Sequence, residues 1–67
     1  MKTGTIKKLV SDRGFGFIEA EDGLDYFFHL SALAVPFEDV NQGDQVRFVP
    51  EQSPRGLRAN QVQLLPR

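Results

Sequence analysis

The chain has 67 residues, no cysteine and a formal net charge of −1. This length allows one domain, which we assign to residues 1–67, and the lack of cysteine excludes disulfides and thiolate metal sites. The N-terminal residues include lysines but no apolar stretch of signal-peptide length, and no later segment could cross a bilayer, so we expect a cytoplasmic protein without a membrane partner.

Residues 3–10 are rich in β-branched and aliphatic side chains, which favours a first strand. Ile6 and Leu9 share a face of that strand only if it contains a bulge or a strong twist. Residues 11–14 form a turn that ends in glycine, and residues 15–19 form the second strand. Asp22-Gly23 is a strong hairpin signal between this strand and a third at residues 24–29. The three strands therefore form a meander.

Apolar residues in 30–40 have nearly helical spacing, but Pro36 would break a regular helix, so we expect one helical turn at 31–33 and then a loop. Residues 45–49 alternate as a fourth strand, which we expect Pro50 to end. Residues 51–56 are polar, contain proline and glycine, and predict an exposed mobile loop. The last strand covers 58–65, with Ala59, Val62 and Leu64 inward. Five short strands predict an all-β, five-stranded antiparallel OB-fold barrel, because closure removes exposed edges.

Strand alternation divides the aromatic side chains of the second and third strands into two sets. The outward set is Phe15, Phe17, Phe27 and His29. The opposite orientation would instead expose Ile18, Tyr26 and Phe28, and the free-energy cost of exposing them would be no lower. A patch of rings in water costs stability and therefore predicts a partner. Unpaired nucleobases fit such a patch, because each base stacked on a ring contributes ~1–3 kcal/mol with little sequence demand.

A net charge of −1 is unfavourable for a nucleic-acid binder, since attraction to phosphate normally supplies most of the non-specific affinity. The distribution of charge is more favourable. Residues 1–13 contain only Asp12 as an acid, against the basic residues Lys2, Lys7, Lys8 and Arg13. An acidic cluster follows at residues 19–25. We therefore expect positive potential beside the rings, and phosphate contacts rather than solubilising charge for Lys7, Lys8 and Arg13.

Catalysis and metal binding find no support in the residue inventory. Asp25, His29 and Ser31 are triad residue types, but they lack the separately oriented arms that such chemistry needs. One histidine with scattered carboxylates does not give metal-ligand spacing. We therefore expect no enzymatic activity, no metal and no cofactor.

Two motifs carry a family resemblance: RGFGFI at Arg13–Ile18, followed at hairpin distance by DYFFH at Asp25–His29. With them, the chain resembles the cold-shock domain, and in particular single-domain bacterial cold-shock proteins, over nearly its whole length. The resemblance implies an OB-type barrel that binds single-stranded RNA or DNA and loosens RNA secondary structure. On matching positions it places contacts at Lys7, Arg13, Phe15, Phe17, Asp25, Phe27, His29, Phe37 and Arg55.

The chain departs from the family pattern in the first strand and just after the second motif, and each departure removes a stacking platform. Lys8 and Leu9 stand where the family usually has tryptophan and phenylalanine, Val10 replaces its asparagine, and Leu30 replaces an aromatic residue. Losing two platforms would cost roughly 2–6 kcal/mol of binding free energy without compensation. Lys8 offers compensation by neutralising a phosphate. We therefore expect weaker, more salt-sensitive binding than the family pattern suggests, with a log-log salt slope of ~0.7 per phosphate contacted.

Several alternatives remain open at this point. His29 is either a plain surface histidine or a base contact, Asp25 either polarises its turn or accepts a hydrogen bond from a base, and Phe37 either caps the barrel or extends the stacking surface. The aromatic face could instead dock a protein or peptide. For the nucleic-acid interpretation we expect a monomer and a pyrimidine-rich partner, because pyrimidines stack weakly on themselves.

Overall fold

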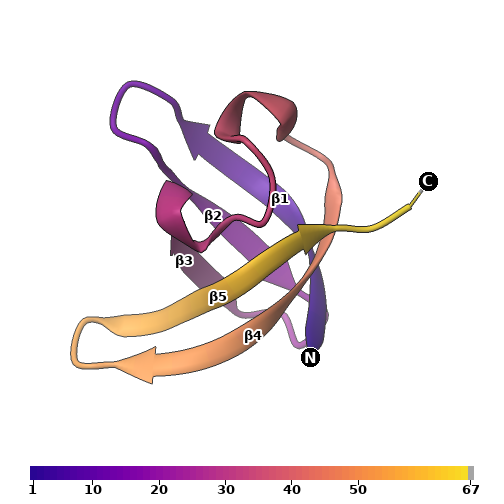
Figure 1. Cartoon of the computed structure of the whole chain (residues 1–67). Coiled ribbons are helices and arrows are strands. Elements are labelled where there is room, and N and C mark those ends of the chain that lie inside the picture. The colour runs from indigo at the N-terminus through magenta and orange to yellow at the C-terminus, as the bar shows by residue number, and fades with distance from the viewer. Residues whose placement is uncertain (67) are drawn as a thin grey trace.

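The computed structural model describes residues 1–66, which form a closed barrel of five strands (Figure 1). These are β1 (Lys2–Val10), β2 (Phe15–Ala20), β3 (Asp25–His29), β4 (Gln45–Ser53) and β5 (Gly56–Leu64). Their order around the barrel is β1-β2-β3-β5-β4. All pairings are antiparallel except the short β3–β5 contact, which is parallel and joins Phe27 to Arg58. The expected all-β, five-stranded OB-type barrel is confirmed, with this one parallel contact as the exception.

The first three strands form the expected meander. The register of β1 against β2 shifts between Ile6 and Lys8, which is the bulge that the spacing of Ile6 and Leu9 required. Ile6 is buried as a result, and Leu9 packs against the core. The β2–β3 turn uses Gly23 at a φ of 83°, and the Gly23 N–H donates to the carbonyl of Ala20. Only glycine adopts that backbone conformation without strain.

The core fills the barrel with side chains from all five strands and the β3–β4 connection. Its buried members are Ile6, Ile18, Ala20, Tyr26, Phe28, Val40, Val46, Phe48, Ala59 and Val62. Phe28 and Phe48 are 0% exposed. Ala59 and Val62 point inward as predicted, and Leu64 is half-buried against the core.

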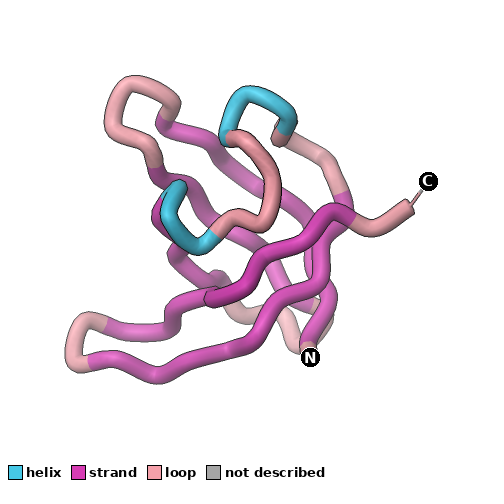
Figure 2. The backbone as a smooth tube through the Cα atoms, in the orientation of Figure 1, coloured by secondary structure: helices cyan, strands magenta, loops and turns pink. Residues whose placement is uncertain are grey.

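Two short 3-10 turns, η1 (Leu30–Ala32) and η2 (Phe37–Asp39), lie in the connection between β3 and β4 (Figure 2). The first begins one residue before the expected helical turn. Phe37 packs half-buried against the core from η2, so the structure favours the barrel cap over an extended stacking surface. No helix within residues 1–66 has the length and apolar character needed to span a membrane.

The predicted end of the fourth strand at Pro50 is wrong, and so is the mobile loop at residues 51–56. β4 continues to Ser53 and pairs with β5 through Pro50 and Ala59, which leaves only Pro54 and Arg55 between the strands. The two strands form a hairpin that projects from the barrel (Figure 1). Pairing of β1 with β4 stops at Phe48, so beyond it β4 has a partner on one side only. Proline is tolerated on such an edge.

Candidate nucleic-acid interface

Three phenylalanine rings meet on the outer face of β2 and β3. The ring centroid of Phe15 lies 5.4 Å from that of Phe27 and 6.1 Å from that of Phe17, and the Phe17 and Phe27 centroids are 5.9 Å apart. Each side chain is half-buried. The outward orientation predicted from alternation is therefore confirmed. We call these three residues the ring cluster.

The inner face of the same strands explains why the rings stay outside. Gly16 lies between Phe15 and Phe17 and pairs with Phe28 of β3. A Cβ atom on Gly16 would stand 2.6 Å from the carbonyl oxygen of Lys8 and 2.7 Å from Cζ of Phe28. The glycine thus leaves room for the Phe28 ring directly beneath the cluster. Adding a ring from β2 to that interior would require the strands to separate.

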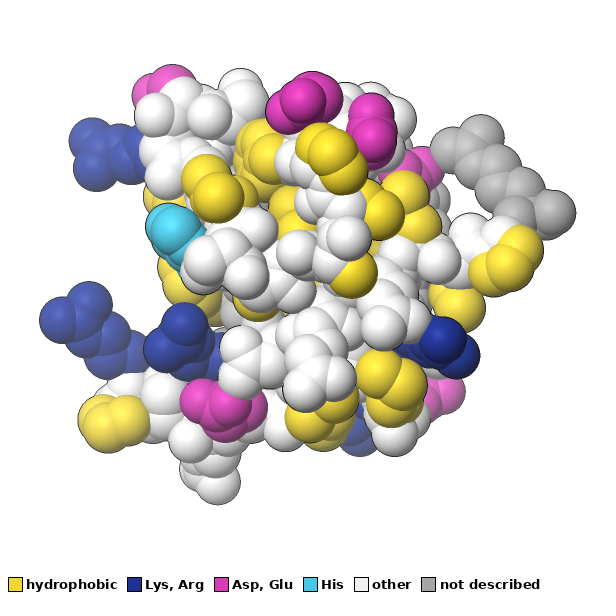
Figure 3. Space-filling model, in the orientation of Figure 1, with side chains coloured by type: hydrophobic (Ala, Val, Ile, Leu, Met, Phe, Trp, Pro, Cys, Tyr) yellow, Lys and Arg dark blue, Asp and Glu magenta, His cyan; other side chains and the backbone are white. Residues whose placement is uncertain are grey.

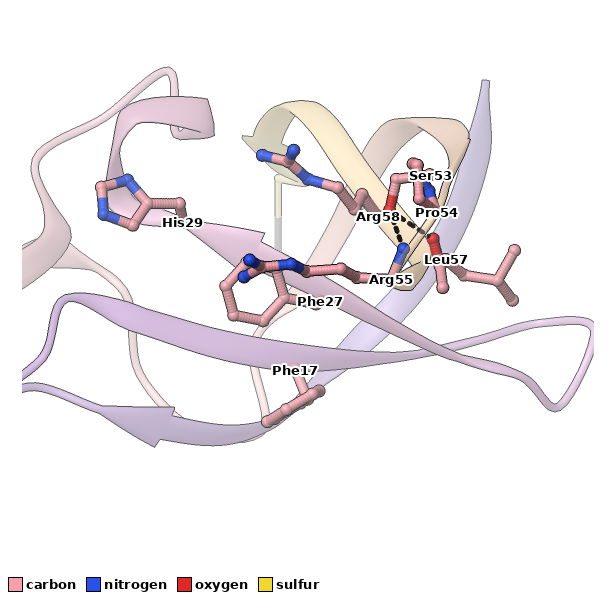
Figure 4. A pocket seen from close by; sticks show the side chains of 9 residues that line it. Phe17, Phe27, His29, Ser53, Pro54, Arg55, Leu57 and Arg58 are labelled. Carbon is pink, nitrogen blue, oxygen red and sulfur yellow. Dashed lines mark hydrogen bonds between the residues drawn. The ribbon is translucent and has the colours of Figure 1, made fainter.

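A groove separates the ring cluster from the β4–β5 hairpin (Figure 4). Its volume is about 670 Å³, and its lining comprises Phe17, Phe27, His29, Ser53, Pro54, Arg55, Gly56, Leu57 and Arg58. The Ser53 hydroxyl donates to the Gly56 carbonyl at 2.8 Å and accepts from the Arg55 N–H at 3.3 Å, which braces the hairpin tip. Arg55 and Arg58 extend from the hairpin toward Phe27 and His29 (Figure 4).

Arg58 is a groove residue that the sequence reasoning missed. It precedes the inward-facing Ala59, so strand alternation alone could have placed it on the outer face. What alternation could not show is which strand faces it. The parallel contact between β3 and β5 brings Arg58 opposite Phe27.

The basic residues fall into two groups according to their partners. Lys2 pairs with Asp22 at 3.1 Å, Lys7 pairs with Asp25 at 3.0 Å, and Arg47 donates to Gln63 at 3.0 Å. Within residues 1–66, the basic side chains with no ion pair or hydrogen bond are Lys8, Arg13, Arg55 and Arg58. In the space-filling view, several Lys and Arg side chains project on the left, the side of the histidine, and others lie at the right and lower edge (Figure 3).

Asp25 and Lys7 form an ion pair at the border of the ring cluster. Both side chains are about half exposed, and the hydrogen bond to the Asp25 carboxylate, with its charge, raises the pKa of Lys7 above its ordinary value of 10.5. Neither partner is therefore fully available until the pair opens. Both lie beside Glu19, which faces Asp25 across the β2–β3 ladder.

His29 stands opposite Phe15 across the β2–β3 ladder and lines the groove. Its Nδ1 accepts the Ser31 N–H at 3.2 Å and lies 3.0 Å from the Ser31 hydroxyl. In the neutral ring the proton therefore sits on Nε2, which remains a donor. Asp25 is bound to Lys7 rather than to His29, so Asp25, His29 and Ser31 do not assemble as a catalytic triad.

Leu30 extends the apolar surface beyond His29 and is 46% exposed. Its Cδ2 stands 2.3 Å from the place where a Gly14 Cβ would be, and its N–H donates to the Gly14 carbonyl at 2.8 Å. Gly14 has a φ of 72°. Leu30 thus holds the β1–β2 turn, which contains Arg13, against the end of β3.

Comparison with known proteins decides the family. The "'Cold-shock' DNA-binding domain" matches residues 2–65. The chain belongs to the cold-shock domain family. Cold shock protein 2 of Lactiplantibacillus plantarum is 45% identical over 64 residues, which cover 94% of this chain and 97% of that protein. Cold shock protein CspC of Bacillus subtilis is 44% identical with the same coverage of both chains.

Among solved structures, "drosophila Unr CSD456" superimposes with a TM-score of 0.82 at 30% identity. The match covers 97% of this cold-shock domain but only 26% of that longer chain. Cold-shock proteins bind nucleic acid and are not enzymes. No group of three or more metal-binding side chains lies together within residues 1–66.

Proposed function

We propose that this cold-shock domain binds single-stranded RNA and DNA and acts as an ATP-independent RNA chaperone that melts secondary structure. The observation that carries the proposal is the ring cluster, three half-buried rings in mutual contact beside a groove whose cations have no ion-pair or hydrogen-bond partner among residues 1–66. Bases that have left a duplex offer π faces to these rings, and each stack contributes ~1–3 kcal/mol.

Four basic side chains without a partner in the described part of the chain, residues 1–66, account for attraction to phosphate in a chain with a net charge of −1. Some of the acidic side chains that make the total negative form ion pairs with Lys2 and Lys7, whereas the unpaired cations border the rings. A phosphate backbone responds to the local potential within about a Debye length, ~8 Å at physiological salt, rather than to the sum over the molecule.

The complete proposed contact set combines rings and polar groups. It comprises Lys7, Lys8, Arg13, Phe15, Phe17, Asp25, Phe27, His29, Phe37 and Arg55. Phe37 is the weakest member, since it packs against the core. The proposal takes residues 1–67 as one domain that acts as a cytoplasmic monomer and prefers pyrimidine-rich strands, because these lose little self-stacking on binding.

Melting of RNA follows from binding alone. A ligand that binds only the unpaired strand shifts the hairpin equilibrium toward the open form by mass action, so no nucleotide hydrolysis is required. A role in transcription, translation or the cold-shock response would act through this shift.

The test uses fluorescence anisotropy with end-labelled oligothymidine and gel shift with an RNA hairpin, each at low and high salt. Phe17→Leu and Phe27→Leu remove the π face but keep apolar bulk, so we expect each to weaken binding about 5- to 100-fold by the loss of one stack. Leu24→Ala is the matched control, because Leu24 is a 50% exposed apolar residue outside the groove.

Binding of the unchanged protein to neither probe would overturn the proposal and favour a protein or peptide as the partner of the ring cluster. Equal binding of all three variants would remove the rings from the interface. Hairpin opening is read separately, as a fall in the hairpin's melting temperature that grows with protein concentration in the absence of ATP.

A further inference from the structure

One row of outward side chains crosses four strands of the barrel. Lys8 of β1 is directly opposite Phe17 of β2, Phe17 is opposite Phe27 of β3, and Phe27 is paired with Arg58 of β5. Directly opposite residues share a face of the sheet. Arg58 also lines the same groove as both rings. The row therefore reads cation, ring, ring, cation.

The charge at both ends of the row is available to a ligand. Neither Lys8 nor Arg58 has an ion pair or a side-chain hydrogen bond within residues 1–66. Glu51 of β4 is directly opposite Arg58, but within residues 1–66 its carboxylate accepts a hydrogen bond from the Asn60 amide and forms no ion pair with Arg58. By contrast, the next row toward the acidic border, Thr5, Glu19 and Asp25, carries two carboxylates against the single cation Lys7, which pairs with Asp25. Phosphate is thus favoured at the ends of the ring row and disfavoured beside it.

The length of the row limits what can occupy it. Neighbouring strands lie about 4.8 Å apart, so three steps from β1 to β5 span roughly 14 Å along the surface. Two ring platforms with a cation beyond each of them match two consecutive bases with a phosphate on either side.

We infer that Lys8 and Arg58 bind the two phosphates that flank a pair of consecutive nucleotides stacked on Phe17 and Phe27. This inference rests on the proposed function and deepens it. It assigns a phosphate-binding role to Arg58, and it makes the ligand of this row a two-base unit with a charge at each end. Arg58 supplies a planar guanidinium, which forms two parallel hydrogen bonds to phosphate oxygens.

The experiment measures the slope of log affinity against log salt for short oligothymidine, with the protein otherwise unchanged. Lys8→Gln and Arg58→Gln should each reduce the magnitude of the slope by about 0.7, and the double variant by about 1.4. Arg58→Lys keeps the charge and should keep the slope. Arg47→Gln also removes one positive charge, but Arg47 lies outside the groove and bonds to Gln63, so its slope should not change.

A second readout uses the ligand. Oligothymidine with neutral methylphosphonate linkages should show the reduced slope with the unchanged protein and no further reduction with the Lys8→Gln/Arg58→Gln double variant. Oligothymidine binding with equal slopes for the unchanged protein and both glutamine variants overturns the inference and leaves the proposed function intact. Failure of the unchanged protein to bind at all would instead refute the proposed function. If Arg47→Gln lowered the slope by the same amount, the change in slope would reflect net charge alone, and the inference would be wrong.

Discussion

At the residue scale, position along a strand decides whether a phenylalanine stabilises the barrel or serves its surface. Phe28 is fully buried, whereas Phe17 lies one ladder position away on the opposite face of the sheet and touches only Phe15 and Phe27 among the rings. Alternation in the sequence was enough to separate these two sets, because both strands are short and regular. The exposure of the ring cluster is thus a consequence of filling the interior with Phe28 and its neighbours.

Truncating one ring from each set should therefore give unequal losses. We predict that Phe28→Ala costs about 3–5 kcal/mol, typical of a buried phenylalanine. That equals the whole stability of ~3–5 kcal/mol expected for a core of this size, so the variant should be largely unfolded. Phe17→Ala should cost less, about 1–3 kcal/mol, from two ring contacts worth ~0.5–1.5 kcal/mol each. Urea unfolding followed by circular dichroism measures both; equal losses would place Phe17 in the core.

A second residue-scale feature is the carboxylate of Asp22 in the β2–β3 turn. It accepts the Leu24 N–H at 2.9 Å and the Tyr26 hydroxyl at 2.9 Å, and it pairs with Lys2 at 3.1 Å. The Leu24 hydrogen bond is the main cause that lowers the pKa of Asp22 below its ordinary value of 3.8, against an opposing contribution from burial. The charged form is therefore the one that the fold prefers.

The pH dependence follows from this sign. The stabilisation by Asp22 is fully present above pH 3.8, the value in the unfolded chain, and is lost as pH falls through the lower pKa of the folded state. We predict that Asp22→Asn is less stable than the unchanged protein at pH 7 and that the difference shrinks toward pH 2. Unfolding by urea at several pH values measures it. Asp12→Asn, in the exposed β1–β2 turn, controls for the loss of one carboxylate; the same pH profile in both variants would contradict the prediction.

At the scale of elements, β2 depends on a residue without a side chain. Gly16 permits the close approach of β1 and of the Phe28 ring, and a Cβ there would stand under 3 Å from both. We predict that Gly16→Ala costs about 1–3 kcal/mol through overpacking. Adding Phe28→Leu provides room for the new methyl group, so the double variant should lose less than the two single variants together. Additive losses in urea unfolding would show that the Phe28 ring is not the obstacle.

The elements that the sequence could and could not predict differ in where their determinants lie. The meander, the bulge near Ile6 and the Asp22-Gly23 turn depend on neighbouring residues, so local patterns were sufficient. The continuation of β4 past Pro50 depends on where its pairing with β1 ends, at Phe48. That is set by the position of another strand and not by the residues around Pro50. Arg58 was missed for the same reason. Its neighbour Phe27 lies 31 positions earlier in the chain, and only the parallel pairing of β3 with β5 brings the two residues together.

At the scale of the whole molecule, net charge is a poor guide to what the surface attracts. The total of −1 combines paired charges, which cancel locally, with four basic side chains that have no partner within residues 1–66. Those four lie near the ring cluster, on the β1 face, in the turn before Phe15 and along the groove. Composition therefore understates the positive potential around the ring cluster, and closure of the barrel is what brings β1 and β5 to its two sides.

Binding should in turn stabilise the barrel, because the interface exists only when β1, β2, β3 and β5 are assembled. A ligand present at 100 times its dissociation constant, with no affinity for the unfolded chain, adds about 2.7 kcal/mol. At ~4–8 °C per kcal/mol for a domain of this size, we predict that saturating oligothymidine raises the Tm by roughly 10–20 °C. Thermal unfolding by circular dichroism measures the shift, with fully paired duplex DNA of equal length as the control. Since paired bases cannot stack on the rings, the duplex should leave the Tm nearly unchanged; an equal rise with both would mean that phosphate alone, and not the ring cluster, holds the ligand.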